Sequence, residues 1–164
     1  MSTAPVRRSR ADLDLLMRRL GTDLALEFRG PAGWWEEGDL GAGNGLGRRD
    51  LAVVSELDAA DQMLITRLKT RRGELAALGH PDYGSRHHEL LGEPNTERTR
   101  NLIKLHVLEC FSHEPRIAKV LDCRVTSDER HRDTVRIVMS IRLIDQDEPR
   151  NLVVPFPLAA GTVL

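Results

Sequence analysis

Thr134-Val-Arg-Ile-Val-Met-Ser-Ile-Arg-Leu-Ile144 is the stretch of this sequence that decides the fold. Apolar side chains stand at every second position and oppose a second set that includes Arg136, Ser140 and Arg142. An alternation of period two is typical of a strand with one face in the core and the other in solvent. We therefore expect the stretch to be a strand of an antiparallel sheet.

Two further strands are expected on either side of this stretch. Residues Ile117 to Thr126 alternate in the same way and lead into a charged turn, and Asn151 to Phe156 form a last short strand. Pro155 and Pro157 cannot donate a hydrogen bond to a neighbouring strand. The last strand is therefore predicted to lie at an edge of the sheet.

Two helices are predicted before the strands. The first opens at Ser55 in the manner of a capping box and ends before Gly73. The second is capped by Asn95 or Thr96, runs to about His113 and is apolar on almost every side. Such a helix is buried on more than one side, inside the fold or against a partner. The order of elements predicts an α+β fold, with two main helices packed on a small, mostly antiparallel sheet.

The N-terminal part differs from the rest of the chain. Asp23 to Phe28 alternate and predict a single half-buried strand, whereas the glycine-rich residues 30–47 predict a loop. Trp34 and Trp35 within that loop either anchor a partner or fold back onto the core. We expect residues 1–48 to be an N-terminal extension with one strand and the loop, and residues 49–164 to be the main domain. No internal repeat is evident.

Composition excludes several classes of function. The 164 residues carry a formal net charge of −1, which gives no basis for binding nucleic acid or an anionic membrane. The basic cluster from Arg67 to Arg72 is interpreted as solvated surface. Cys110 and Cys123 lie in apolar segments and are expected to be reduced, buried thiols. No signal peptide is expected, which favours synthesis in the cytoplasm.

No set of residues predicts catalysis. His106, Glu109 and His113 share one side of the second helix and could ligate a metal, but a polar stripe that makes hydrogen bonds is favoured. A glycosidase needs two facing carboxyl groups, and Glu114 alone has distinctive surroundings. An ion-paired or helix-terminal carboxylate is the favoured interpretation of Glu114. We therefore expect no enzyme activity and no cofactor or metal.

Four segments in order resemble the gene-25-like (GPW) baseplate family of contractile phage tails. They are Leu68-Lys-Thr-Arg-Arg-Gly-Glu74, Pro81-Asp-Tyr-Gly-Ser85, the Leu90-Leu91 pair and Glu114-Pro-Arg-Ile117. The resemblance as a whole spans about Asp50 to Ile144. They are similar to that family's L-x-T-x-x-G-E helix exit, its P-x-[FY]-G-S turn and its E-P-R-I motif. The family also includes proteins of type VI secretion and of extracellular contractile injection systems.

The resemblance implies a structural protein that joins the baseplate wedge to the first sheath ring and templates the sheath. It implies the sheath protein and wedge proteins as partners, with inner tube or spike-hub proteins as further candidates. Assembly would occur in the cytoplasm, in a phage-tail-like particle that can be released. The residues expected to bind partners are Glu114, Pro115, Arg116, Tyr83, Val153 and Phe156.

Two other classes of function stay open on the sequence alone. One is a small cell-wall hydrolase of the tail, resembling a lysozyme, and the other is an adaptor outside any tail machine. A wall-clearing assay would distinguish the hydrolase. A neighbouring gene for a sheath or tube protein would exclude the adaptor.

Overall fold

The computed structural model describes residues 20–29, 37–45 and 48–159. The chain divides into two compact units, Met1–Met63 and Leu64–Leu164. The division falls inside helix α2 (Glu56–Lys69). Two helices and small antiparallel sheets confirm the expected α+β class.

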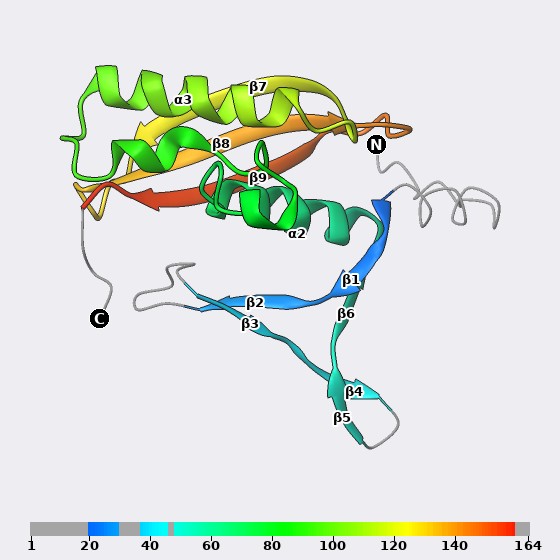
Figure 1. Ribbon diagram of the computed structural model, residues 1–164. Helices are drawn as coiled ribbons and strands as arrows, with labels where there is room; N and C mark the ends of the chain where they lie inside the picture. The colour runs from blue at the N-terminus through cyan, green and yellow to red at the C-terminus, as the bar shows by residue number, and fades with distance from the viewer. Residues whose placement is uncertain (1–19, 30–36, 46–47, 160–164) are drawn as a thin grey trace, which may run out of the picture. The chain divides into compact units, whose positions relative to one another are not determined.

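A three-stranded antiparallel sheet forms the centre of the second unit (Figure 1). Its strands β7 (Ile117–Ser127), β8 (Thr134–Leu143) and β9 (Arg150–Pro157) follow the expected segments, in the order β7-β8-β9. β9 is thus an edge strand of this sheet, as Pro155 and Pro157 predicted.

The alternating apolar residues of β8 form one buried face of the strand. The inward residues are at most 1% exposed; they are Val135, Ile137, Met139, Ile141 and Leu143. On β7 the phase changes at a register shift between Val120 and Asp122. Leu121 is therefore 46% exposed although Cys123, two residues later, is buried, because a bulge sets two residues opposite one.

The predicted helices are also present. α3 (Glu97–Ser112) begins after Thr96, whose side chain accepts a hydrogen bond from the N–H of Thr99. α3 packs against β7 and buries Ile103, Val107, Cys110 and Phe111. Its remaining circumference is only partly covered, and Leu105 is 57% exposed. Short 3-10 helices η2 (Ala76–Leu78) and η3 (Arg86–Leu90) connect α2 to α3.

The first unit contains three two-stranded antiparallel ribbons instead of one strand and a loop. They pair β1 (Thr22–Leu24) with β6 (Val53–Ser55), β2 (Leu26–Arg29) with β3 (Glu37–Leu40), and β4 (Ala42–Gly45) with β5 (Arg48–Leu51). The single strand predicted over 23–28 is broken at Ala25, whose N–H bonds to the carbonyl of Ala52. The glycine-rich segment predicted as a loop holds β3 and β4, because strand pairing satisfies its backbone groups.

Some expectations fall outside the described residues, among them those for Trp34 and Trp35 and for the first 19 residues of the N-terminal extension. Within the described part of the chain, no helix is long and apolar enough to cross a membrane.

Candidate partner-binding site

Two of the motif segments are joined by a short parallel bridge between Arg71 and Ser85. Ser85 donates its N–H to the carbonyl of Thr70 (2.9 Å), and Arg72 donates its N–H to the carbonyl of Ser85 (3.2 Å). Gly84 makes this approach possible. Its φ is +97°, and a Cβ there would lie 2.7 Å from backbone atoms of Thr70 and Arg71. The helix exit and the Pro81–Ser85 turn therefore form one rigid corner.

The carboxylate of Glu114 lies at the centre of a buried ion-pair cluster. Its side chain is 3% exposed. Oε1 accepts hydrogen bonds from Arg116 Nε (2.7 Å) and from the Arg116 N–H (3.2 Å), and Oε2 accepts one from Arg67 Nη1 (3.3 Å). The Glu114 carboxylate is therefore held between two guanidinium groups, which compensate for its burial.

Arg67 corrects the interpretation of the basic cluster as solvated surface. It is only 8% exposed, and its guanidinium carbon lies 4.8 Å from the centre of the Tyr83 ring. Its Nε is buried without a hydrogen-bond acceptor among the described residues. Arg67 faces inward because it lies three residues after the buried Leu64, on the same side of α2, where its guanidinium meets the Glu114 carboxylate.

The turn after α3 presents the other residues of the E-P-R-I motif. Glu114 donates its N–H to Phe111, and Ile117 donates to the carbonyl of Glu114, both at 3.1 Å. Pro115 is exposed, and the Arg116 side chain is 32% exposed. Arg116 thus pairs with Glu114 on one side while part of its guanidinium arm stays accessible to a partner.

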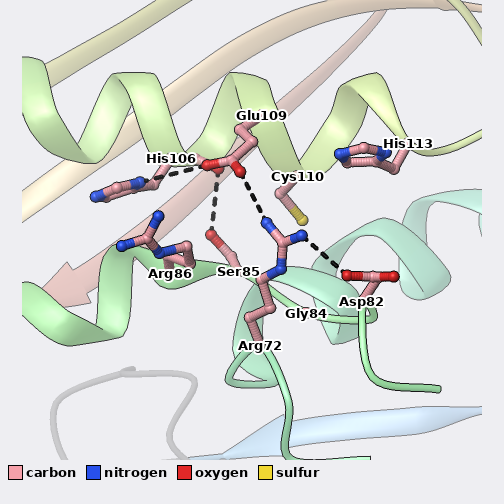
Figure 2. A pocket seen from close by; sticks show the side chains of 9 residues that line it. All are labelled: Arg72, Asp82, Gly84, Ser85, Arg86, His106, Glu109, Cys110 and His113. Atoms are coloured by element: carbon pink, nitrogen blue, oxygen red, sulfur yellow. Dashed lines mark hydrogen bonds and ion pairs between the residues drawn. The ribbon is translucent and has the colours of Figure 1, made fainter. Parts of the chain in front are cut away.

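A second ion-pair group lies on the neighbouring side of α3 (Figure 2). Arg72 donates to Glu109 (2.7 Å) and to Asp82 (3.0 Å), and so ties the turn to the helix. This hydrogen bond from Arg72 lowers the pKa of Glu109. The depression between these residues is too shallow to enclose a water molecule.

The three metal candidates His106, Glu109 and His113 differ in their surroundings, and His106 Nδ1 is buried without a hydrogen-bond partner among the described residues. The Glu109 carboxylate is occupied by Arg72 and lies 3.6 Å from His106 Nδ1, and His113 is exposed. No group of three metal-ligating side chains occurs among the described residues.

Val153 and Phe156 lie on opposite faces of β9. Val153 is 40% exposed, whereas Phe156 is 6% exposed. The Phe156 ring packs edge-on against His87 (4.5 Å) and His88 (5.6 Å), so it is not available to a partner in this conformation. Of the residues expected to bind partners, Glu114 and Phe156 are thus buried. Pro115 and Val153 are exposed, and Arg116 and Tyr83 are partly exposed.

The structure places His87 in the core, a position that we did not predict from the sequence. Its ring is 2% exposed and stacks on His88, and Nδ1 lies 2.8 Å from Ser85 Oγ. Burial lowers the pKa of His87 to about 3, so the ring is neutral in the folded protein near neutral pH. Two adjacent histidines, His87 and His88, close to the Pro81–Ser85 turn were the available signal.

Among the comparisons with known proteins, matches come from solved structures. No protein-family model and no curated protein matches the chain significantly. A solved structure of a candidate tail lysozyme from Geobacter sulfurreducens is similar, with 25% identity and a TM-score of 0.57. The similarity covers 66% of this chain and 96% of that chain. It supports the resemblance to phage-tail proteins that the four motif segments indicated.

Proposed function

We propose that the chain is a structural baseplate component of a contractile, phage-tail-like machine, which joins the wedge to the first sheath ring and templates the sheath. The similarity to a tail protein supports the setting. The open edge of β9 carries the proposal about the sheath, because an unpaired edge can accept a strand from another chain.

The positions of the prolines show which backbone N–H groups of β9 face this edge. Pro155 and Pro157 have no N–H, and the N–H of Leu158 points toward the β8 side, where it bonds to Asp133 (2.6 Å). Directions alternate along a strand, so the N–H groups of Asn151 and Val153 face the free edge. An added strand would therefore bond most fully along the first half of β9.

Val153→Pro tests this mechanism. The substitution removes an N–H that faces the open edge and leaves the bonds to β8 in place, as Pro155 does already. We expect a folded protein whose baseplates carry a tube but no anchored sheath, as seen by negative-stain microscopy. Val153→Thr keeps the N–H and should assemble normally. Fully sheathed particles from a folded Val153→Pro variant would refute strand addition at this edge.

The particle would assemble in the cytoplasm, with the sheath and wedge proteins as partners of this chain and inner tube or spike-hub proteins as further candidates. The partly exposed Arg116 is suited to a bidentate contact with a partner carboxylate, since Glu114 and the turn hold its position. Arg116→Lys should weaken attachment to the wedge, because an ammonium group lacks the planar fork.

A cell-wall hydrolase is the second candidate, favoured by the description of the similar Geobacter protein. The Glu114 carboxylate accepts hydrogen bonds from Arg67 and Arg116, an arrangement that does not suit a general acid. We expect the purified chain not to clear peptidoglycan suspensions. Clearing that Glu114→Gln abolishes, while the fold persists, would establish the hydrolase instead.

A further inference from the structure

The three ribbons of the first unit meet at a closed ring of backbone hydrogen bonds (Figure 1). Ala25 donates its N–H to the carbonyl of Ala52 (2.8 Å), Ala52 donates to Gly41 (2.7 Å), and Gly41 donates to Ala25 (2.8 Å). Each of these residues stands at the break between two successive strands. The ring therefore fixes the point from which the three ribbons diverge.

The sequence around this ring repeats three times. Asp-Leu-Ala at 23–25, Asp-Leu-Gly at 39–41 and Asp-Leu-Ala at 50–52 each end on a ring residue. In every copy the aspartate Oδ1 accepts a hydrogen bond from the N–H of the following leucine at 2.8 Å. A Cβ on Gly41 would lie 3.3 Å from the Ala52 Cβ, so the third residue must be small. The first unit thus has an approximate threefold repeat.

The repeat holds three leucines in exposed positions. Leu24, Leu40 and Leu51, named here the leucine ring, are 39%, 47% and 46% exposed. Since the three copies share one local geometry around a common ring, their leucines lie on the same side of it. Apolar side chains gathered at fixed, exposed positions are typical of a surface that another molecule covers.

The charge of this region indicates what covers it. Each leucine follows an exposed aspartate, and the first unit, residues 1–63, contains eight arginines against 11 acidic residues, a formal charge of −3. Residues 64–164 contain 16 basic and 14 acidic residues, a formal charge of +2. Complementary potentials steer association and select partners, so the partner of the acidic region should be basic.

We propose that the leucine ring is a docking surface for a protein segment that combines an apolar side chain with flanking lysine or arginine residues. The apolar side chain would pack among the leucines, and the basic residues would lie near Asp23, Asp39 and Asp50. This inference is independent of the baseplate function, because it follows from the first unit alone.

A photo-crosslinking amino acid at position 40 of the full-length chain, in the producing cells, tests the proposal. The expected product joins the chain to another protein at a segment with apolar and basic residues, identified by mass spectrometry. The same amino acid at the exposed position of Leu78 should not give this product. No crosslink, a crosslink to a second copy of the chain, or a crosslink to an acidic segment would overturn the proposal.

A synthetic peptide of the crosslinked segment then serves as the probe for binding to the purified chain. Combined Asp23→Asn, Asp39→Asn and Asp50→Asn substitutions remove the charge and keep the oxygen that accepts the leucine N–H. Leu24→Ser, Leu40→Ser and Leu51→Ser remove the apolar contacts. Each triple variant should bind at least about tenfold more weakly, while Leu78→Ser binds normally. Unchanged binding by the folded Asn variant would overturn the proposal, even if the Ser variant perturbs the fold.

Discussion

At the scale of single residues, Glu114 determines how the E-P-R-I turn is held. The carboxylate of Glu114 is buried between Arg67 and Arg116. Its removal would leave the buried Arg67 guanidinium without an anion. We predict that Glu114→Ala lowers the free energy of unfolding by about 3–5 kcal/mol, measured by urea denaturation.

Two controls separate this effect from a general loss of charge. Glu89→Ala breaks the exposed pair with Arg86 and should cost no more than about 1 kcal/mol. The double variant Arg67→Met with Glu114→Leu should recover much of the loss, since apolar groups replace both buried charges. Equal stability of Glu114→Ala and wild type would show that the cluster contributes nothing to the fold.

Gly84 gives a second prediction at this scale. Gly84→Ala adds a Cβ at φ +97°, 2.7 Å from backbone atoms of Thr70 and Arg71, so the corner must open. Gly79→Ala is the matched control, because φ is +87° there and no atom lies within 4 Å of the added Cβ. Thermal melts should show that Gly79→Ala lowers the free energy of unfolding by about 1 kcal/mol and that Gly84→Ala lowers it by clearly more. Equal costs would mean that the corner adapts without strain.

At the scale of elements, η3 and β9 meet through a buried aromatic group. His87 and His88 pack against Phe156, and His88 Nε2 lies 2.8 Å from the carbonyl of Leu68 at the end of α2. Burial lowers the pKa of both histidines. These contacts link the edge strand β9 to η3 and α2. The packing of β9 against these helices should therefore weaken at acidic pH.

The sign of the pH dependence follows from the lowered pKa of His87. In the unfolded chain His87 takes up a proton near its ordinary pKa of 6.5, whereas in the folded protein it does so only near about 3. His87 therefore makes its full contribution to the free energy of unfolding above about pH 6.5. As the pH falls toward 3, this contribution declines by a few kcal/mol.

Urea denaturation at several pH values measures this slope. His87→Gln should flatten it between pH 6.5 and 3, whereas the exposed His80→Gln should not. An identical slope in wild type and His87→Gln would mean that other groups cause the acid sensitivity.

At the scale of the whole molecule, the two units should differ in how readily they open. β8 is paired on both sides and buries five apolar side chains, but each ribbon of the first unit has only two strands. Two-stranded ribbons are marginally stable alone. We predict that amides of β2 to β5 exchange with solvent much faster than those of β8 in the free protein, and that assembly slows them. Equal protection in the free protein would contradict this prediction.

Local patterns were sufficient for the main elements. The alternation of Thr134 to Ile144, the cap at Thr96 and the prolines of the last strand each predict an element through contacts between residues close in sequence. The same patterns placed β9 at the edge of the sheet. These features follow from backbone sterics and side-chain periodicity, which are read one segment at a time.

The sequence by itself determined the α+β class, the order of the strands along the chain and the end of the second helix near His113. Only the tertiary structure decided that Arg67 is buried, because its partner Glu114 lies 47 residues further along the chain. It also decided that glycine-rich residues form ribbons, because Ala25, Gly41 and Ala52 satisfy one another's backbone groups only when distant strands meet. Contacts between distant segments depend on the complete fold, so no local pattern predicts them.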